Sequence, residues 1–100
     1  MRLFVNQTNR VYTDPVMDIT VDPNIPITDA TAACKLYDMS DVLITNSDIA
    51  LLHTSGGVYV GEWPVLAVVK DTKYQIEIIV TKAGKTIWYT KQEITARINV

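Results

Sequence analysis

The sequence predicts an all-β domain, an antiparallel β-sandwich of about seven strands that follows an extended N-terminal segment. Apolar and polar residues alternate along much of the chain, as they do on strands with one buried face. Turn-forming residues recur about every 8–12 residues, which is the spacing expected of a sandwich or a barrel. The 100 residues, 48% of them hydrophobic, are enough for the core of one domain.

The first 29 residues differ from the rest because they contain three of the four prolines. A residue that precedes proline is held in an extended conformation. Residues 3–5 and 11–12 are candidate edge strands, and one further strand is predicted by the alternation of Met17, Ile19 and Val21. This segment is either a first strand with a loop or an arm that packs on a neighbouring subunit. We therefore divide the chain into an N-terminal segment, residues 1–29, and a sandwich, residues 30–100.

The middle of the chain alternates in several short segments. Strands are expected at residues 30–38, 42–45, 49–54 and 58–63. Asn, Asp and Ser between them hydrogen-bond their own backbone and favour turns, and Pro64 ends the last strand because it cannot donate to a ladder. Residues 65–69 are either a further short strand or an irregular apolar crossing. Alanines leave a helix as the alternative near the start of the first of these strands.

The clearest strand lies in the second half of the chain. Residues 74–81 place four apolar side chains on one parity: Tyr74, Ile76, Ile78 and Val80. Residues 82–85 form a short connection with a glycine, which suits a hairpin. A strand at 86–90 follows, and residues 94–100 show the same two-residue period.

Tyr74 opens this strand directly after the loop at residues 70–73. In immunoglobulin-like sandwiches, a tyrosine in this place turns its hydroxyl back onto the preceding backbone and forms the tyrosine corner. The alternative is an ordinary tyrosine packed within a strand. We expect a structural role for Tyr74 in either case.

Composition excludes several classes of function. One Cys excludes an intramolecular disulfide, and one His excludes a His-cluster metal site. A net charge of −2 gives no basic surface for nucleic acid. No apolar run approaches the roughly 20 residues of a membrane span, and the first residues become polar too early for a signal peptide. We expect no metal, cofactor, nucleic-acid or membrane partner, and a protein made inside the cell.

No catalytic constellation is predicted. Cys34 lies on the apolar parity of its strand, so we expect a buried, inert thiol and not a nucleophile paired with His53. His53 is expected near a turn, at the surface or half-buried. The carboxylates lie in turns without the spacing of a calcium loop. Two of them can still meet in space as in a glycosidase, although so small a sandwich has little room for a substrate cleft.

The aromatic residues are the best candidates for partner contacts. Trp88 and Tyr89 are adjacent and have opposite parity, so one of them is expected to face away from the core. An exposed aromatic can anchor an interface, whereas the alternative is a ring packed on its own sheet. The candidate contact residues are Phe4, Trp63 and Tyr89.

Three stretches resemble small immunoglobulin-like domains of tailed-bacteriophage structural proteins. Residues 30–38 end in Leu-Tyr-Asp before a turn, residues 57–64 read Gly-x-Tyr-x-Gly-x-x-Pro, and residues 73–78 are similar to the Tyr-x-Val-x-Val strand of these proteins. The match covers roughly residues 30–80. The turn at 39–41 lacks a glycine, and the proline-rich first 29 residues have no counterpart.

The resemblance implies an immunoglobulin-like sandwich and a non-enzymatic role in the virion, after synthesis in the host cytoplasm. The domain would bind capsid or neck subunits, and copies of itself, as a head decoration, cement or head–tail component. The aromatic residues leave an alternative, an adhesin-like or carbohydrate-binding module. An enzyme that uses clustered carboxylates is a third hypothesis.

Overall fold

The structure is a computed structural model that describes residues 2–98. This part of the chain contains strands and no helix, so the all-β prediction is confirmed for it. The strands are β1 (Leu3–Phe4), β2 (Asn9–Tyr12), β3 (Met17–Asp18), β4 (Ile25–Pro26), β5 (Thr31–Asp38), β6 (Ile49–Ser55), β7 (Val58–Trp63), β8 (Lys73–Lys82) and β9 (Lys85–Arg97).

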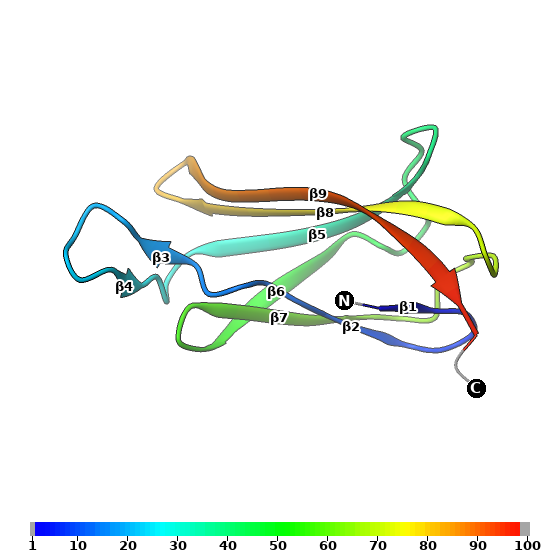
Figure 1. The fold of residues 1–100 in the computed structure, drawn as a ribbon, viewed down its shortest axis with the longest axis horizontal. Helices are drawn as coiled ribbons and strands as arrows, with labels where there is room; N and C mark the ends of the chain where they lie inside the picture. The colour runs from blue at the N-terminus through cyan, green and yellow to red at the C-terminus, as the bar shows by residue number, and fades with distance from the viewer. Residues whose placement is uncertain (1, 99–100) are drawn as a thin grey trace.

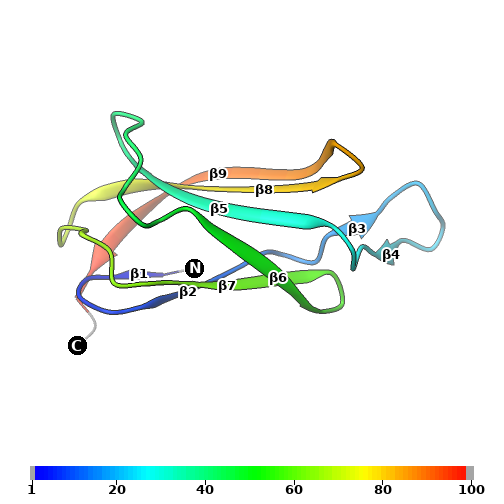
Figure 2. The same ribbon diagram turned by 180° about the vertical axis from the view of Figure 1, so that it is seen from behind.

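Seven strands form one sheet in the order β1-β9-β8-β5-β6-β7-β2, and β3 and β4 form a small separate sheet. Neighbouring strands are antiparallel, except that β1 runs parallel to β9. Figures 1 and 2 show β9, β8 and β5 in one layer and β6, β7, β2 and β1 in the other. Strand β6 joins the layers, because Leu51 is paired with β5 and Leu52 with β7. The two layers are therefore halves of one curled, mostly antiparallel sheet.

The two ends of the strand order meet through the side chain of Asn9. The N–H of Phe4 donates to Oδ1 of Asn9 over 2.8 Å, and Nδ2 of Asn9 donates to the carbonyl of Phe4 over 3.0 Å. The amide thus makes the two bonds that a neighbouring strand would make to β1. Asn9 is buried, and these bonds satisfy its polar atoms.

The core lies between the layers and follows the alternation of the strands. All four apolar residues of one parity in β8 are buried, and β5 buries Ala32, Cys34 and Leu36. The largest fully buried side chain is Trp63, whose Nε1 donates to the carbonyl of Ser47 over 2.7 Å. This bond lets the polar turn before β6 lie against the core.

The β6–β7 hairpin depends on glycine at its turn. Gly57 has a φ of 82°, and a Cβ there would lie 2.5 Å from the carbonyl oxygen of Val16. Its own carbonyl accepts a hydrogen bond of 2.9 Å from the N–H of Val16. The close approach ties this hairpin to the N-terminal segment.

Several predicted strands differ in the structure. The strand expected at 42–45 is reduced to one bridge between Leu43 and Tyr37, because the Asp38 carboxylate accepts two backbone N–H groups and holds the chain in a turn. Residues 65–69 form the irregular crossing. The strands at 86–90 and 94–100 are parts of one strand, β9. The last two residues, Asn99 and Val100, lie outside the described residues.

The arm interpretation of residues 1–29 is wrong for the described part of that segment. Leu3, Val11 and Val16 are fully buried in the core, and β1 and β2 are strands of the main sheet. The predicted strand around residues 17–21 ends at Asp18, whose carboxylate accepts bonds from the N–H and hydroxyl of Thr20. Residue 29 is therefore no boundary between an arm and a separate sandwich.

Candidate functional site

The three predicted contact residues lie in different places, and Trp63 is not at the surface. Its side chain has no exposed area, because β7 turns positions 59, 61 and 63 inward. The prediction that Trp63 contacts a partner is therefore wrong. Phe4 is half-buried on β1, and Tyr89 is 52% exposed on β9.

Trp88 and Tyr89 face opposite sides of the sheet, as their opposite parity predicts. Tyr89 points outward, whereas Trp88 packs against the buried core. Tyr89 is directly opposite Ile79 of β8, and both belong to the outer face of β5, β8 and β9. This polar face is one of two surfaces that can serve as a site.

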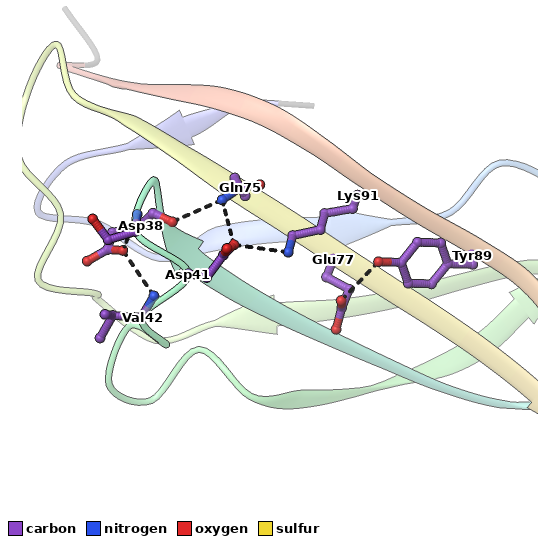
Figure 3. A network of polar contacts seen from close by, with 8 residues as sticks. Asp38, Asp41, Val42, Gln75, Glu77, Tyr89 and Lys91 are labelled. Atoms are coloured by element: carbon purple, nitrogen blue, oxygen red, sulfur yellow. Dashed lines mark hydrogen bonds and ion pairs between the residues drawn. The ribbon is translucent and has the colours of Figure 1, made fainter.

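Figure 3 shows how the side chains of the polar face contact one another. The Tyr89 hydroxyl donates to Oε2 of Glu77 over 3.1 Å. The Nζ of Lys91 lies 3.2 Å from Oδ1 of Asp41 and 5.1 Å from the ring centre of Tyr37. Gln75 donates to the same Asp41 oxygen over 3.0 Å. The polar face therefore has two neighbouring sets of contacts, one between Tyr89 and Glu77 and one that joins Lys91, Asp41, Gln75 and Tyr37.

Hydrogen bonds, desolvation and charges on the polar face shift several pKa values. The hydrogen bonds from Lys91 and Gln75, together with the charge of Lys91, lower the pKa of Asp41. The hydrogen bond to Asp41 raises the pKa of Lys91. Desolvation, followed by the bond to Glu77, raises the pKa of Tyr89. The lysine and Asp41 thus remain ionised at neutral pH, and the tyrosine keeps its proton.

The second surface is the outer face of β2, β7 and β6. Tyr12 is directly opposite Val60, and Val60 is directly opposite Leu52 on the next strand. Leu52 is 73% exposed, Tyr12 is 48% exposed and Val60 is half-buried. We call these three residues, which lie side by side on three strands, the apolar row.

A shallow depression of about 340 Å³ lies beside the apolar row. It is lined by Arg10, Tyr12, Thr54, Ser55, Val58 and Val60. A depression of this shape on a sheet face can receive a side chain of another molecule. Sequence reasoning missed the row, although the adjacent leucines 51 and 52 indicate a strand that is apolar on both faces.

The hydroxyl of Tyr74 turns back onto the preceding backbone. It accepts a hydrogen bond of 2.8 Å from the N–H of Val69, and the ring is buried. This is the geometry of the tyrosine corner described above. The bond holds the irregular crossing before β8 against the sheet and gives Tyr74 a structural role.

Cys34 and His53 have separate environments. Burial raises the pKa of the Cys34 thiol to about 12, so the thiol keeps its proton at neutral pH. His53 is half-buried, and its Nε2 accepts a hydrogen bond of 3.2 Å from the N–H of Gly57. Within residues 2–98, no group of three His, Cys, Asp or Glu side chains is placed to hold a metal ion.

Two further findings concern the chain as a whole. None of the secondary structure described in the chain is a helix long and apolar enough to cross a membrane. Comparison with models of protein families, with curated proteins and with solved structures finds no match.

Proposed function

We propose that this chain is a non-enzymatic structural protein of a tailed-phage particle. In this proposal it is an immunoglobulin-like sandwich that attaches to capsid or neck subunits and to copies of itself, as a decoration, cement or head–tail component. The resemblance of residues 30–38, 57–64 and 73–78 to such proteins supports the phage assignment. The tyrosine-corner geometry of Tyr74 supports the immunoglobulin-like class.

The observation that carries an attachment role is the uncovered apolar row. Side chains such as Leu52 gain about 1.5–3 kcal/mol when they are fully buried rather than exposed. Tyr12 and Leu52 are exposed and Val60 between them is half-buried, so one contact can cover the whole row. Single exposed apolar residues are ordinary on protein surfaces, but contiguous ones indicate an interaction site.

Mass spectrometry and cryo-electron microscopy of the purified particles test this proposal. We expect the chain to remain with particles through density-gradient purification and to occupy repeated positions on the head, neck or tail. A non-structural phage protein of similar abundance in the infected cell serves as the control. Absence of the chain from particles that contain the other structural proteins would overturn the proposal.

The polar face supports a second candidate, a carbohydrate-binding or adhesin-like module. Tyr89 offers an exposed aromatic ring to a sugar, and Glu77 and Lys91 lie on the same face as hydrogen-bonding groups. A glycan array with the purified domain tests this function. Binding that is lost in Tyr89→Ala and retained in Leu52→Ser would support it, and no binding to any glycan would argue against it.

A further inference from the structure

We propose that the outer face of β2, β7 and β6 binds a second copy of this chain, with a two-fold axis between β2 and β7. This inference rests on the proposed function in taking that face as an attachment surface. It goes further by naming the partner and the pairs of residues that meet. Two observations carry it: the apolar row and the charged pair beside it.

The charged pair consists of Arg10 and Glu62. The two residues are directly opposite one another on β2 and β7, two positions along the strands from Tyr12 and Val60. Both are exposed and point to the same side as the apolar row, because side chains two residues apart share a face. In residues 2–98 neither of them forms an ion pair with another side chain.

A two-fold axis parallel to the strands, running between β2 and β7 in the plane of the interface, brings the charged pair and two residues of the apolar row, Tyr12 and Val60, onto the second copy. Leu52 lies on β6, on the far side of β7 from the axis, so it faces past the β2 edge of the second copy. The axis places β7 of the second copy over β2 of the first, at the same height along the strands. Tyr12 then faces Val60 of the second copy, and Arg10 faces Glu62 of the second copy. Because the interface is isologous, each of these contacts occurs twice. Sheets pack face to face in this aligned way at about 10 Å.

Charge complementarity favours a second copy over an unrelated surface. Arg10 and Glu62 lie side by side on adjacent strands. They match a surface that places an acidic group over Arg10 and a basic group over Glu62. The two-fold operation produces that surface from the chain itself. A uniformly acidic or basic partner would pair with one of the two groups and repel the other.

The polar face also has a row of apolar residues, formed by Ala33, Ile79 and Tyr89, but only Tyr89 of these three is exposed. Most of its charged groups already have partners within the chain: Lys91 is paired with Asp41, and Glu77 is bonded to Tyr89. Lys35, directly opposite Glu77, forms no ion pair within residues 2–98. A second copy would have to break the contacts of Lys91 and Glu77 to use their charges. The proposal therefore assigns self-association to the β2–β7–β6 face and not to the polar face.

Charge-reversal variants of the full chain test the pairing. We expect Arg10→Glu and Glu62→Arg each to raise the dissociation constant of the dimer by about tenfold or more, because each converts two attractions into two repulsions. Sedimentation velocity over a concentration series measures the effect, and circular dichroism confirms that each variant is folded. Lys91→Glu, on the polar face, is the matched control and should leave the dissociation constant unchanged.

Mixing the two variants gives the decisive result. An Arg10→Glu chain presents two acids and a Glu62→Arg chain presents two bases, so the mixture should form a heterodimer although each variant alone is weakened. Pairing within one chain cannot produce this rescue. A wild-type chain that stays monomeric, unchanged association in the single variants, or a mixture without heterodimer would each overturn the inference.

These outcomes are separate from those of the proposed function. A monomeric chain that is present in purified particles would overturn the self-association and leave the particle assignment standing. A charge-dependent dimer that is absent from particles would support the self-association and overturn the particle assignment.

Discussion

The two outer faces of the curled sheet differ in how many of their side chains already have partners within the chain. On the polar face of β5, β8 and β9, Lys91 and Glu77 contact Asp41 and Tyr89. On the face of β2, β7 and β6, the apolar row is uncovered and Arg10 has no ion-pair partner among the described residues. Both faces follow the same alternation of side chains, and they differ in what the outward positions hold.

This difference indicates separate roles for the two faces. Polar groups that already bond to one another gain little from a protein partner, because a new contact must replace existing ones. An apolar row in water gains free energy from being covered. The polar face is therefore suited to small hydrogen-bonding ligands or to solvent, and the apolar row to a protein surface.

The largest effect on stability is expected for a substitution in the core that lies beneath both faces. Trp63→Ala should lower the free energy of unfolding by about 3–5 kcal/mol, because it leaves a cavity and an unpaired Ser47 carbonyl. Tyr89→Ala on the polar face should change it by about 0.5 kcal/mol or less. Denaturant unfolding of both variants measures the difference. Equal effects of the two substitutions would contradict the assignment of one aromatic to the core and the other to the surface.

A smaller effect on stability is expected from removing the hydroxyl of Tyr74, which holds the crossing before β8. Tyr74→Phe keeps the buried ring and removes the bond from the N–H of Val69, so stability should fall by about 0.5–1.5 kcal/mol. Amide hydrogen exchange at Val69 should accelerate, whereas exchange in the β6–β7 hairpin should follow only the global change. Unaltered protection of Val69 would show that the hydroxyl bond does not hold the crossing.

Tyr12→Ser tests the apolar row directly. We expect the free energy of unfolding to change by about 0.5 kcal/mol or less, because the side chain is exposed. Self-association should weaken by roughly tenfold, the equivalent of about 1.4 kcal/mol. The matched control is Tyr89→Ser, which removes a comparably exposed apolar group from the other face. If both variants associate like the wild type, the two faces do not differ as described.

The smallest effect is the pH dependence of the polar face. The pKa of Asp41 is lowered from its ordinary value of 3.8, so its stabilising contribution is present above that value and is lost as the pH falls through the folded pKa. Carboxyl-carbon NMR should show Asp41 titrating below its ordinary value of 3.8. In Lys91→Ala this difference should shrink, and an unchanged titration would place the lysine outside the interaction.

Much of the fold could be predicted from the chain itself. Strands β5, β7 and β8, the hairpin between β8 and β9, and the buried parity of Tyr74 and Cys34 all follow from local alternation and turn residues. The strand expected at 42–45 failed because side-chain bonds from Asp38 override the alternation. The candidate site was harder to predict. Trp63 and Tyr89 are both aromatic residues in predicted strands, and the sequence does not distinguish the buried one from the exposed one.

The sequence by itself determined the all-β class, the positions of most strands and which residues share a face. Those properties depend on neighbours along the chain. The tertiary structure alone decided that Trp63 points into the core, that residues 3–12 join the main sheet, and that Tyr12, Val60 and Leu52 form one row. These properties depend on which strands pair and in what register, and pairing brings together residues as far apart as 12 and 60 in the chain. Alternation gives each strand two faces, but only the pairing of strands decides which face is covered.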